Sequence, residues 1–276
     1  MEQKDKDIFE QTTKFNTGIK LYMFQTGTIK TKIKFIKMNQ GEEPFEIPVP
    51  WFLIKHPKGD IIIDGGMPIE TAIDKHKHWG SVIEAYDPVM KKSEWCRDQI
   101  KTVNTNPEDI KYVIQTHLHL DHSGAIGHFP NATHITQRLE YDYAFNPDWF
   151  SQPAYIREDF DKPNIRWKFL QGRKTDFYDV HGDGVIKIIF TPGHTPGHQS
   201  VLVNLPKTGH MLFTGDACYT EDHWCDKCLP GLVASSSDAA ESVSKLRKVA
   251  KEHDATVVWG HDPISWKNWK KAPMFY

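Results

Sequence analysis

The chain has 276 residues, of which 39% are hydrophobic and 25% charged, and its formal net charge is −2. This composition is that of a globular protein with a sizeable core, and the near-neutral charge gives no indication of nucleic acid or an anionic membrane as a partner. The polar start, MEQKDKDIFEQTTKF, has no apolar stretch typical of a signal peptide, and no run approaches the roughly 20 apolar residues of a membrane span. We therefore expect a cytoplasmic protein.

Apolar runs bounded by turn residues predict strands along most of the chain. The first pair is WFLIKHPKGDIIIDGG, a strand and a Pro-Lys-Gly-Asp turn followed by a second strand at residues 61–63. Further strands are predicted in DIKYVIQT, GVIKIIFTPGH, QSVLVNLPKTGHMLFTGD and ATVVWGHD. Helices are predicted between these strands, which favours a layered α/β domain.

Two segments predict helices, and a third is open. Residues 88–103 are expected to be helical, and so is SDAAESVSKLRKVAKEHD, in which Asp238 and Glu241 resemble a capping box. Residues 141–170 are rich in aromatic side chains and interrupted by proline. They predict either core helix or a lid over a site.

The four cysteines are too few for a disulfide scaffold in a chain of this length. We expect free thiols in a reducing compartment. The CDKC sequence, Cys225 to Cys228, lies near His223 and could also be half of a structural metal site.

Metal-competent side chains follow four of the predicted strands, in the segments THLHLDHSG, TPGH, FTGD and GHD. Because layered α/β folds build their sites at strand ends, we expect these side chains to meet. They are His117, His119, Asp121, His122, His194, Asp216 and His261.

The five imidazoles and two carboxylates of this set favour zinc, with iron, cobalt, manganese or nickel as other options. Seven ligands exceed one tetrahedral site and suit two metal ions that share a carboxylate. Side chains two apart in an extended segment share a face, so His117 and His119 can reach one ion while Asp121 and His122 reach the other. The sequence therefore predicts a dinuclear metal site.

The four segments, in this order, resemble the metallo-β-lactamase superfamily, and the resemblance runs from about Lys20 to Ile264. It implies an αβ/βα sandwich of two mixed sheets flanked by helices, with metals at one edge. It also implies that His117, His119 and His194 hold one ion, that Asp121, His122 and His261 hold the other, and that Asp216 bridges them.

Within that superfamily the chain is most similar to the N-acyl homoserine lactone lactonases. The matching segments are PVPWFLIKHPKGDIIIDGGMP, TQRLEYDYA, TPGHTPGHQSV and GDACYTEDH. Asp216 sets the chain apart from two-zinc β-lactamases, and His119 sets it apart from flavodiiron oxidases. Lactonases have a tyrosine at the substrate carbonyl, three residues after the bridging aspartate, and Tyr219 has this spacing. Cys218 and the segment HWCDKC depart from the common pattern, which leaves the substrate preference open.

The resemblance implies that a hydroxide bridging two zinc ions opens the lactone ring of N-acyl homoserine lactones, which are quorum-sensing signals. Tyr219 would donate a hydrogen bond to the carbonyl, and Asp121 would carry a proton from the water to the leaving alkoxide. Asp64 is either an acceptor for a ligand imidazole or a turn cap, and the role of His198 is equally open. The candidate residues of the acyl groove are Tyr219, Leu120, Met67, Ile69, Trp149, Phe150 and Tyr155.

Two other functions remain open at this stage. A thioester hydrolase of glyoxalase II type would use the same metals and would need basic residues late in the chain, where Lys267, Lys270 and Lys271 stand. A metal-binding protein without turnover would use HWCDKC as a partner interface. We expect one hydrolase domain over residues 1–276, with 1–18 as an N-terminal extension, and a homodimer is left open.

Overall fold

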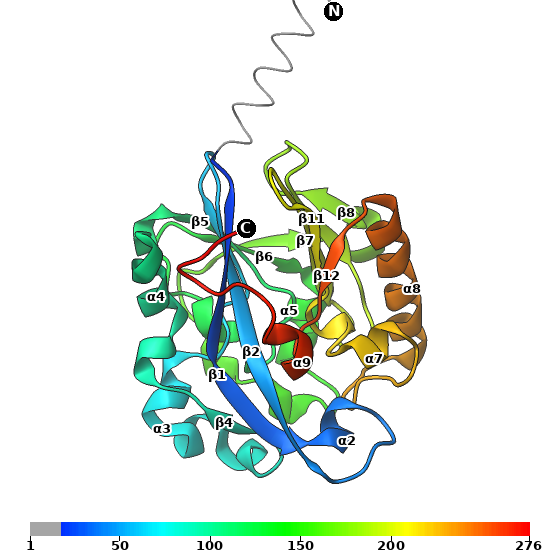
Figure 1. Cartoon of the computed structure of the whole chain (residues 1–276). Coiled ribbons are helices and arrows are strands. Elements are labelled where there is room, and N and C mark those ends of the chain that lie inside the picture. Colours follow the sequence, from blue (N-terminus) through cyan, green and yellow to red (C-terminus); the bar gives the residue numbers. More distant parts are fainter. Residues whose placement is uncertain (1–17) are drawn as a thin grey trace, which may run out of the picture.

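The structure is a computed structural model that describes residues 18–276. Two β-sheets lie face to face, and helices cover their outer surfaces (Figure 1). This αβ/βα sandwich confirms the predicted architecture. The expected N-terminal extension, residues 1–18, falls outside the described residues except for Gly18.

The first sheet consists of β1 (Lys20–Lys32), β2 (Pro44–Lys55), β3 (Asp60–Ile63), β4 (Asp87–Val89), β5 (Ile110–Ile114), β6 (Thr133–Gln137) and β7 (Arg166–Leu170), in the order β4-β1-β2-β3-β5-β6-β7. The second consists of β8 (Phe177–Asp179), β9 (Ile186–Phe190), β10 (Gln199–Leu205), β11 (Gly209–Phe213) and β12 (Thr256–Val258), in the order β12-β11-β10-β9-β8. The α-helices are α2 (Ile33–Ile36), α3 (Ile69–Trp79), α4 (Cys96–Gln99), α5 (Arg138–Phe145), α6 (Arg157–Phe160), α7 (Glu221–Trp224), α8 (Ser236–Glu252) and α9 (Pro263–Trp266).

The period of two along each strand separates the core into layers. In β2, Phe52 and Ile54 point between the sheets, whereas Trp51 and Leu53 point towards α4 and its neighbouring turns. The ring of Phe52 meets that of Phe213 from the second sheet, with centroids 4.4 Å apart. Both faces of the central strands are therefore buried, which explains their nearly continuous apolar sequence.

On the second sheet, α8 covers the outer face (Figure 1), packing Leu246 against Leu202 and Leu212. This helix begins at Ser236, not at the expected Asp238, because the side chain of Ser235 caps it by accepting a hydrogen bond from Asp238 N at 3.2 Å. Asp238, the expected cap, therefore lies inside the first turn, and no capping box with Glu241 forms.

Residues 88–103 are only partly helical. β4 pairs with β1 through Pro88, and α4 with its flanking 3-10 turns follows. Pro88 fits an edge strand because proline cannot donate to a central ladder.

Residues 141–170 contain the end of α5, all of α6 and the strand β7, which is the edge of the first sheet. Residues 166–170 are therefore part of the sheet and not of a lid. The lid hypothesis stays a prediction for the segment between α5 and α6. Among residues 18–276, no helix has the length and apolar character needed to cross a bilayer.

Backbone hydrogen bonds hold together the loops at the edge where β5 ends, and one of them joins the two sheets. Gln199 N at the start of β10 donates to Thr116 O at 2.9 Å. Close by, His261 N donates to Tyr219 O at 2.8 Å, which ties the loop after β12 to the loop after β11. The loops that carry the metal-competent side chains are thus held together by the fold itself.

Candidate metal centre and cavity

All seven predicted metal ligands lie together at this edge of the sandwich. The loop after β5 provides His117, His119, Asp121 and His122, and β9, β11 and β12 are each followed by one of the others. They form two groups whose potential ligand atoms lie within 4.8 Å of one another: His117, His119, His194 and Asp216 in one, and Asp121, His122 and His261 in the other.

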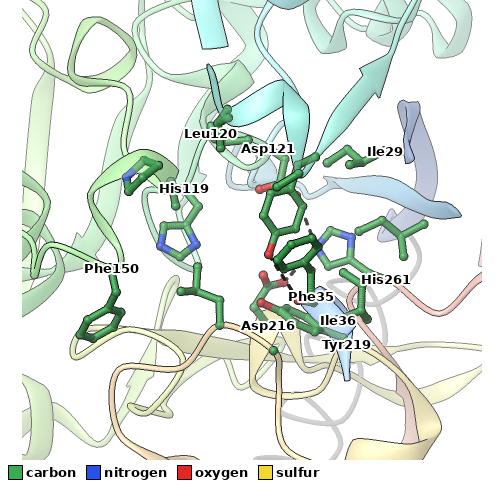
Figure 2. A pocket seen from close by; sticks show the side chains of 18 of the residues that line it. Ile29, Phe35, Ile36, His119, Leu120, Asp121, Phe150, Asp216, Tyr219 and His261 are labelled. Carbon is green, nitrogen blue, oxygen red and sulfur yellow. Dashed lines mark hydrogen bonds and ion pairs between the residues drawn. The ribbon is translucent and has the colours of Figure 1, made fainter. Parts of the chain in front are cut away.

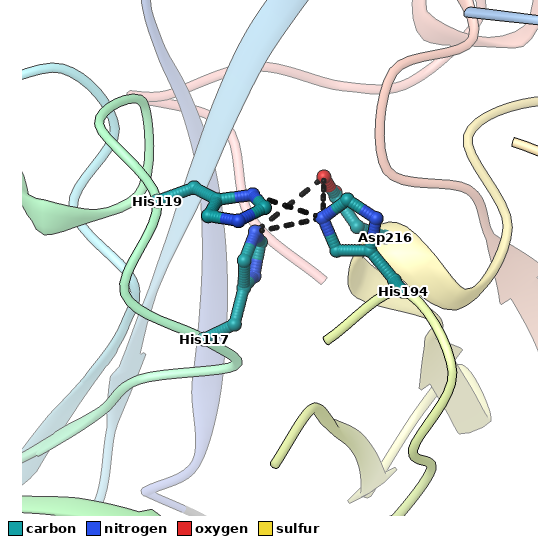
Figure 3. Close-up of side chains that lie close together, drawn as sticks. All are labelled: His117, His119, His194 and Asp216. Atoms are coloured by element: carbon teal, nitrogen blue, oxygen red, sulfur yellow. Dashed lines mark hydrogen bonds and ion pairs between the residues drawn. The ribbon is translucent and has the colours of Figure 1, made fainter. Parts of the chain in front are cut away.

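In the first group, the ring nitrogens converge on one point (Figure 3). His194 Nε2 lies 3.2 Å from His117 Nε2 and 3.0 Å from His119 Nδ1. The Oδ2 atom of Asp216 lies 3.3 Å from His194 Nε2. Three imidazoles and one carboxylate oxygen therefore surround a volume suited to a divalent ion.

The second group converges on the other oxygen of the same carboxylate. Asp216 Oδ1 lies 3.1 Å from His261 Nε2 and 3.4 Å from His122 Nε2. Asp121 Oδ2 lies 3.6 Å from His261 Nε2. Because its two oxygens face different groups, Asp216 has the geometry of a bridging ligand.

In four of the five histidines, all but His119, the opposite ring nitrogen has a hydrogen-bond partner, which fixes the orientation of the ring. The Nδ1 atoms of His261 and His194 lie 2.8 Å and 3.0 Å from the carbonyls of Pro48 and Leu232, to which they can donate. The Nε2 lone pairs are then left to face the centre. His122 Nε2 and Asp216 Oδ1 are buried without a hydrogen-bond partner, as expected for atoms that bind a metal.

The electrostatics of the site suit the same conclusion. Burial and the neighbouring imidazoles hold the pKa of His117 and His119 well below its usual value, so these rings are neutral. Burial alone would raise the pKa of Asp216, but His122, His261 and His117 lower it well below the usual range. In the first group, neutral imidazoles and an ionised carboxylate are the forms that bind metal. In the second, Asp216 and Asp121 raise the pKa of His122 and His261 despite their burial, so metal binding there displaces protons.

Asp64 is an acceptor for a ligand and also fixes the turn that follows β5. Its carboxylate accepts hydrogen bonds from Thr116 N at 2.7 Å and Thr116 Oγ1 at 2.9 Å, and lies 2.9 Å from His122 Nδ1. The aspartate therefore holds the His122 proton on Nδ1. The contact with His122 supports the first interpretation, an acceptor for a ligand imidazole.

His198 positions the bridging aspartate through the backbone. Its Nε2 accepts a hydrogen bond from Asp216 N at 3.0 Å, and its Nδ1 lies 3.1 Å from Thr191 O. Gly215 has a φ of 53°, and a Cβ there would lie 2.8 Å from His198 Nε2. Only glycine allows this approach without strain.

A cavity of about 410 Å³ opens beside the metal-ligand groups. Figure 2 shows His119, Asp121, Asp216 and His261 around it, with Phe150 on the His119 side and Ile29, Phe35 and Ile36 on the His261 side. The wall is mostly apolar and is completed by Ile47, Ser81, Val82, Ala85, Tyr86, Leu120, Pro153, Ala154, Tyr219, Gly231 and Leu232.

A sequence model of the metallo-beta-lactamase superfamily matches residues 45–261. The chain belongs to this superfamily. Among relatives, the N-acyl homoserine lactonase AttM of Rhizobium radiobacter is 59% identical over 94% of this chain and 99% of its own length. An N-acyl homoserine lactonase from a Bacillus species is 33% identical over 84% of this chain and 88% of its own.

A solved structure with the same fold superposes on nearly the whole chain. It is an N-acyl homoserine lactone hydrolase with the product N-hexanoyl-L-homoserine bound at the catalytic metal centre. It superposes with a TM-score of 0.84 at 27% identity, covering 94% of this chain and 100% of that one.

Three of the predicted groove residues of this chain, Leu120, Phe150 and Tyr219, lie in the cavity wall. The other four lie elsewhere. Met67 is fully buried in the core behind the wall, Ile69 is the first residue of α3, and Trp149 is 85% exposed. Tyr155 packs edge-on against His119, with ring centroids 4.6 Å apart, and its hydroxyl donates to Glu140 at 3.0 Å.

The sequence prediction missed most of the wall. Ile29, Ile36, Tyr86 and Leu232 come from segments far apart in the chain, and apolar side chains that line a cavity look like core side chains in a sequence. Glu140 was missed as well, although a glutamate that is 0% exposed is unusual. A carboxylate at a helical position that faces the core would have been the signal.

The CDKC segment does not form a metal site with His223. Both nitrogens of His223 are engaged, Nδ1 with Thr220 N at 3.1 Å and Nε2 with Ile36 O at 3.2 Å. Cys225 and Cys228 are free thiols. In the described part of the chain, the only groups with metal-ligand spacing are the two beside the cavity.

Proposed function

We propose that this protein is a lactonase that hydrolyses the lactone ring of N-acyl homoserine lactones at a dinuclear metal centre. The observation that carries the proposal is the position of Tyr219, whose hydroxyl lies 3.3 Å from Nδ1 of the ligand His194 and lines the apolar cavity. The relatives named as lactonases, one of them 59% identical over nearly the whole chain, support the same substrate class.

The ligand set favours two zinc ions. His117, His119 and His194 would hold one ion, Asp121, His122 and His261 the other, and Asp216 would bridge them, a donor set rich in imidazole that suits zinc better than calcium or magnesium. When bound, such ions lower the pKa of water to near neutrality and polarise a carbonyl. The protein residues would orient the substrate and transfer a proton from water to the leaving alkoxide.

Tyr219 can donate a hydrogen bond throughout the neutral range. Burial, together with the carboxylate of Asp216, raises the pKa of its hydroxyl well above 10. Nδ1 of His194 already has Leu232 O as an acceptor at 3.0 Å, so the phenolic proton is left to point into the cavity. A donor aimed at the lactone carbonyl stabilises the negative charge that develops there.

Asp121 is the carboxylate best placed to move a proton. It lines the cavity and is less buried than Asp216, with 13% of its side chain exposed against 5%. Its oxygens lie 3.6 Å from His261 Nε2 and 3.7 Å from His122 Nε2, and therefore make no direct hydrogen bond to either ring. The carboxylate is free to take a proton from water and to deliver it to the leaving alkoxide.

The acyl chain would lie against the apolar part of the wall. Ile29, Ile36 and Ile47 come from β1, α2 and β2, and Val82 comes from the turn after α3. Apolar contacts of this kind contribute roughly 0.8 kcal/mol for each buried methylene group. The volume of about 410 Å³ is within the range of small-molecule sites.

The thioester-hydrolase alternative is not favoured. A glutathione moiety carries carboxylates and needs basic partners, but Lys267, Lys270 and Lys271 do not line the cavity. A binding protein without turnover is equally disfavoured, because it does not explain a tyrosine donor placed beside a complete ligand set.

A pH-drop assay on the zinc-loaded protein tests the function. Short- and long-chain N-acyl homoserine lactones are compared with S-lactoylglutathione at equal concentration. We expect acid release from the lactones, and hydrolysis of the thioester alone would overturn the proposal.

A further inference from the structure

Glu140 is a buried carboxylate that joins the two loops of the first ligand group. It lies on α5 and is 0% exposed. Its Oε1 accepts hydrogen bonds from Leu118 N at 2.9 Å and from the Tyr155 hydroxyl at 3.0 Å, and its Oε2 accepts from Thr195 Oγ1 at 2.5 Å.

These donors are adjacent to metal ligands. Leu118 stands between His117 and His119, and Thr195 directly follows His194. Tyr155, whose hydroxyl is the third donor, packs its ring against His119. One carboxylate therefore fixes the backbone or the neighbour of all three histidines in the group.

The backbone of the loop after His194 lies directly against α5. A Cβ at Gly197 would lie 2.1 Å from Glu140 N, so the backbone of the loop rests directly on the helix. The contact keeps the segment that carries His194 and Thr195 next to Glu140.

The charge of Glu140 has no cationic partner among the described residues. Burial raises the pKa of Glu140 above its usual value, and the hydrogen bonds from Thr195, Leu118 and Tyr155 limit that rise. Three donors suit an ionised carboxylate, which only accepts hydrogen bonds and has no proton to give. A buried anion without a paired cation is unfavourable, and a divalent ion held by the adjacent histidines would compensate it.

We propose that Glu140 is a positioning residue that sets the metal affinity of the group formed by His117, His119 and His194. It acts through the backbone of Leu118 and the hydroxyl of Thr195, and its negative charge favours a cation at that group. The inference rests on the proposed metal centre but not on the identity of the substrate.

The test is metal binding by the variant Glu140→Gln. The metal-free protein is titrated with Co²⁺ against a competing chelator, and the absorption of bound Co²⁺ resolves the binding steps. We expect one of the two ions to bind about 10- to 100-fold more weakly, the usual effect of losing a partner of a ligand. Asp142→Asn is the matched control, because Asp142 lies on the same helix and 61% of its side chain is exposed. This control should bind Co²⁺ as the parent does.

A second pair of variants covers the case in which Glu140→Gln does not fold. Thr195→Val removes one donor and keeps the charge, and we expect an affinity loss of about 3- to 10-fold, which Thr195→Ser should restore. Unchanged Co²⁺ affinity in a folded Glu140→Gln, or in Thr195→Val if the first variant is unfolded, would overturn the inference. The lactone assay decides the proposed function separately, since Co²⁺ affinity does not depend on the substrate.

Discussion

Replacing Asp64 by asparagine tests how the second ligand group is held. Asp64 has a left-handed backbone with a φ of 62°, a conformation that asparagine also adopts, so the change adds no backbone strain. The carboxylate accepts hydrogen bonds from Thr116 N and Thr116 Oγ1, and it lies within hydrogen-bond distance of His122 Nδ1. An amide has a single acceptor oxygen. If this oxygen keeps the hydrogen bond from Thr116 N, the amide NH₂ group takes the place of the carboxylate oxygen that faces His122 Nδ1.

The expected magnitude follows from these contacts. Facing a donor, His122 would carry its proton on Nε2, the atom that lies 3.4 Å from Asp216 Oδ1 and faces the second ion. We expect about 10- to 100-fold weaker binding of that ion, or about 1.4–2.7 kcal/mol. Loss of a buried acceptor also lowers the free energy of unfolding of the metal-free protein by about 1–3 kcal/mol.

Metal content after dialysis and urea unfolding measure the two effects. We expect about one ion per chain in Asp64→Asn where the parent retains about two. The control is Asp254→Asn, the same change at a left-handed but exposed position with a φ of 48°. If Asp64→Asn retained both ions with the affinity of the parent, Asp64 would not be what orients His122.

Three further predictions concern turnover, the bridge and pH. Tyr219→Phe should lower lactone turnover by about 10²- to 10³-fold with unchanged metal content, and equal turnover in a steady-state assay would exclude Tyr219 as the carbonyl donor. Asp216→Asn should release metal from both groups, because each carboxylate oxygen faces one of them; elemental analysis showing two retained ions would contradict the bridging role. Burial lowers the pKa of His134 from 6.5 to about 4, so its contribution to stability is complete above about pH 6.5 and is lost as the pH falls towards 4. Urea unfolding of the metal-free protein at pH 7 and 4.5 should show about 2–3 kcal/mol less pH-dependent loss in His134→Gln, and identical losses would count against a neutral buried His134.

Local patterns predicted seven of the described strands, β2, β3, β5, β9, β10, β11 and β12, and missed five. The apolar runs of β2, β3 and β10 were visible because both faces of these strands are buried. The edge strands β4, β7 and β8 were not predicted, because a strand with one exposed face needs few apolar residues and RWKFL or FYD carries no clear alternation. The interior strands β1 and β6 were missed as well, because polar residues interrupt the apolar ones in KLYMFQTGTIKTK and THITQ. The start of α8 was placed too late because three serines, Ser235 to Ser237, precede Asp238 and each could cap.

The sequence alone determined which side chains are available for metal, since the histidines and aspartates follow strand ends, and strand ends of a layered fold converge. It also placed Tyr219 three residues after Asp216. Only the tertiary structure decided that the two oxygens of Asp216 face different groups, that Glu140 joins the loops of His117 and His194, and that the cavity wall comes from β1, α2 and the turn after α3. These features depend on contacts between segments far apart in the chain, and an apolar or buried polar residue carries no local mark of the partner it will meet.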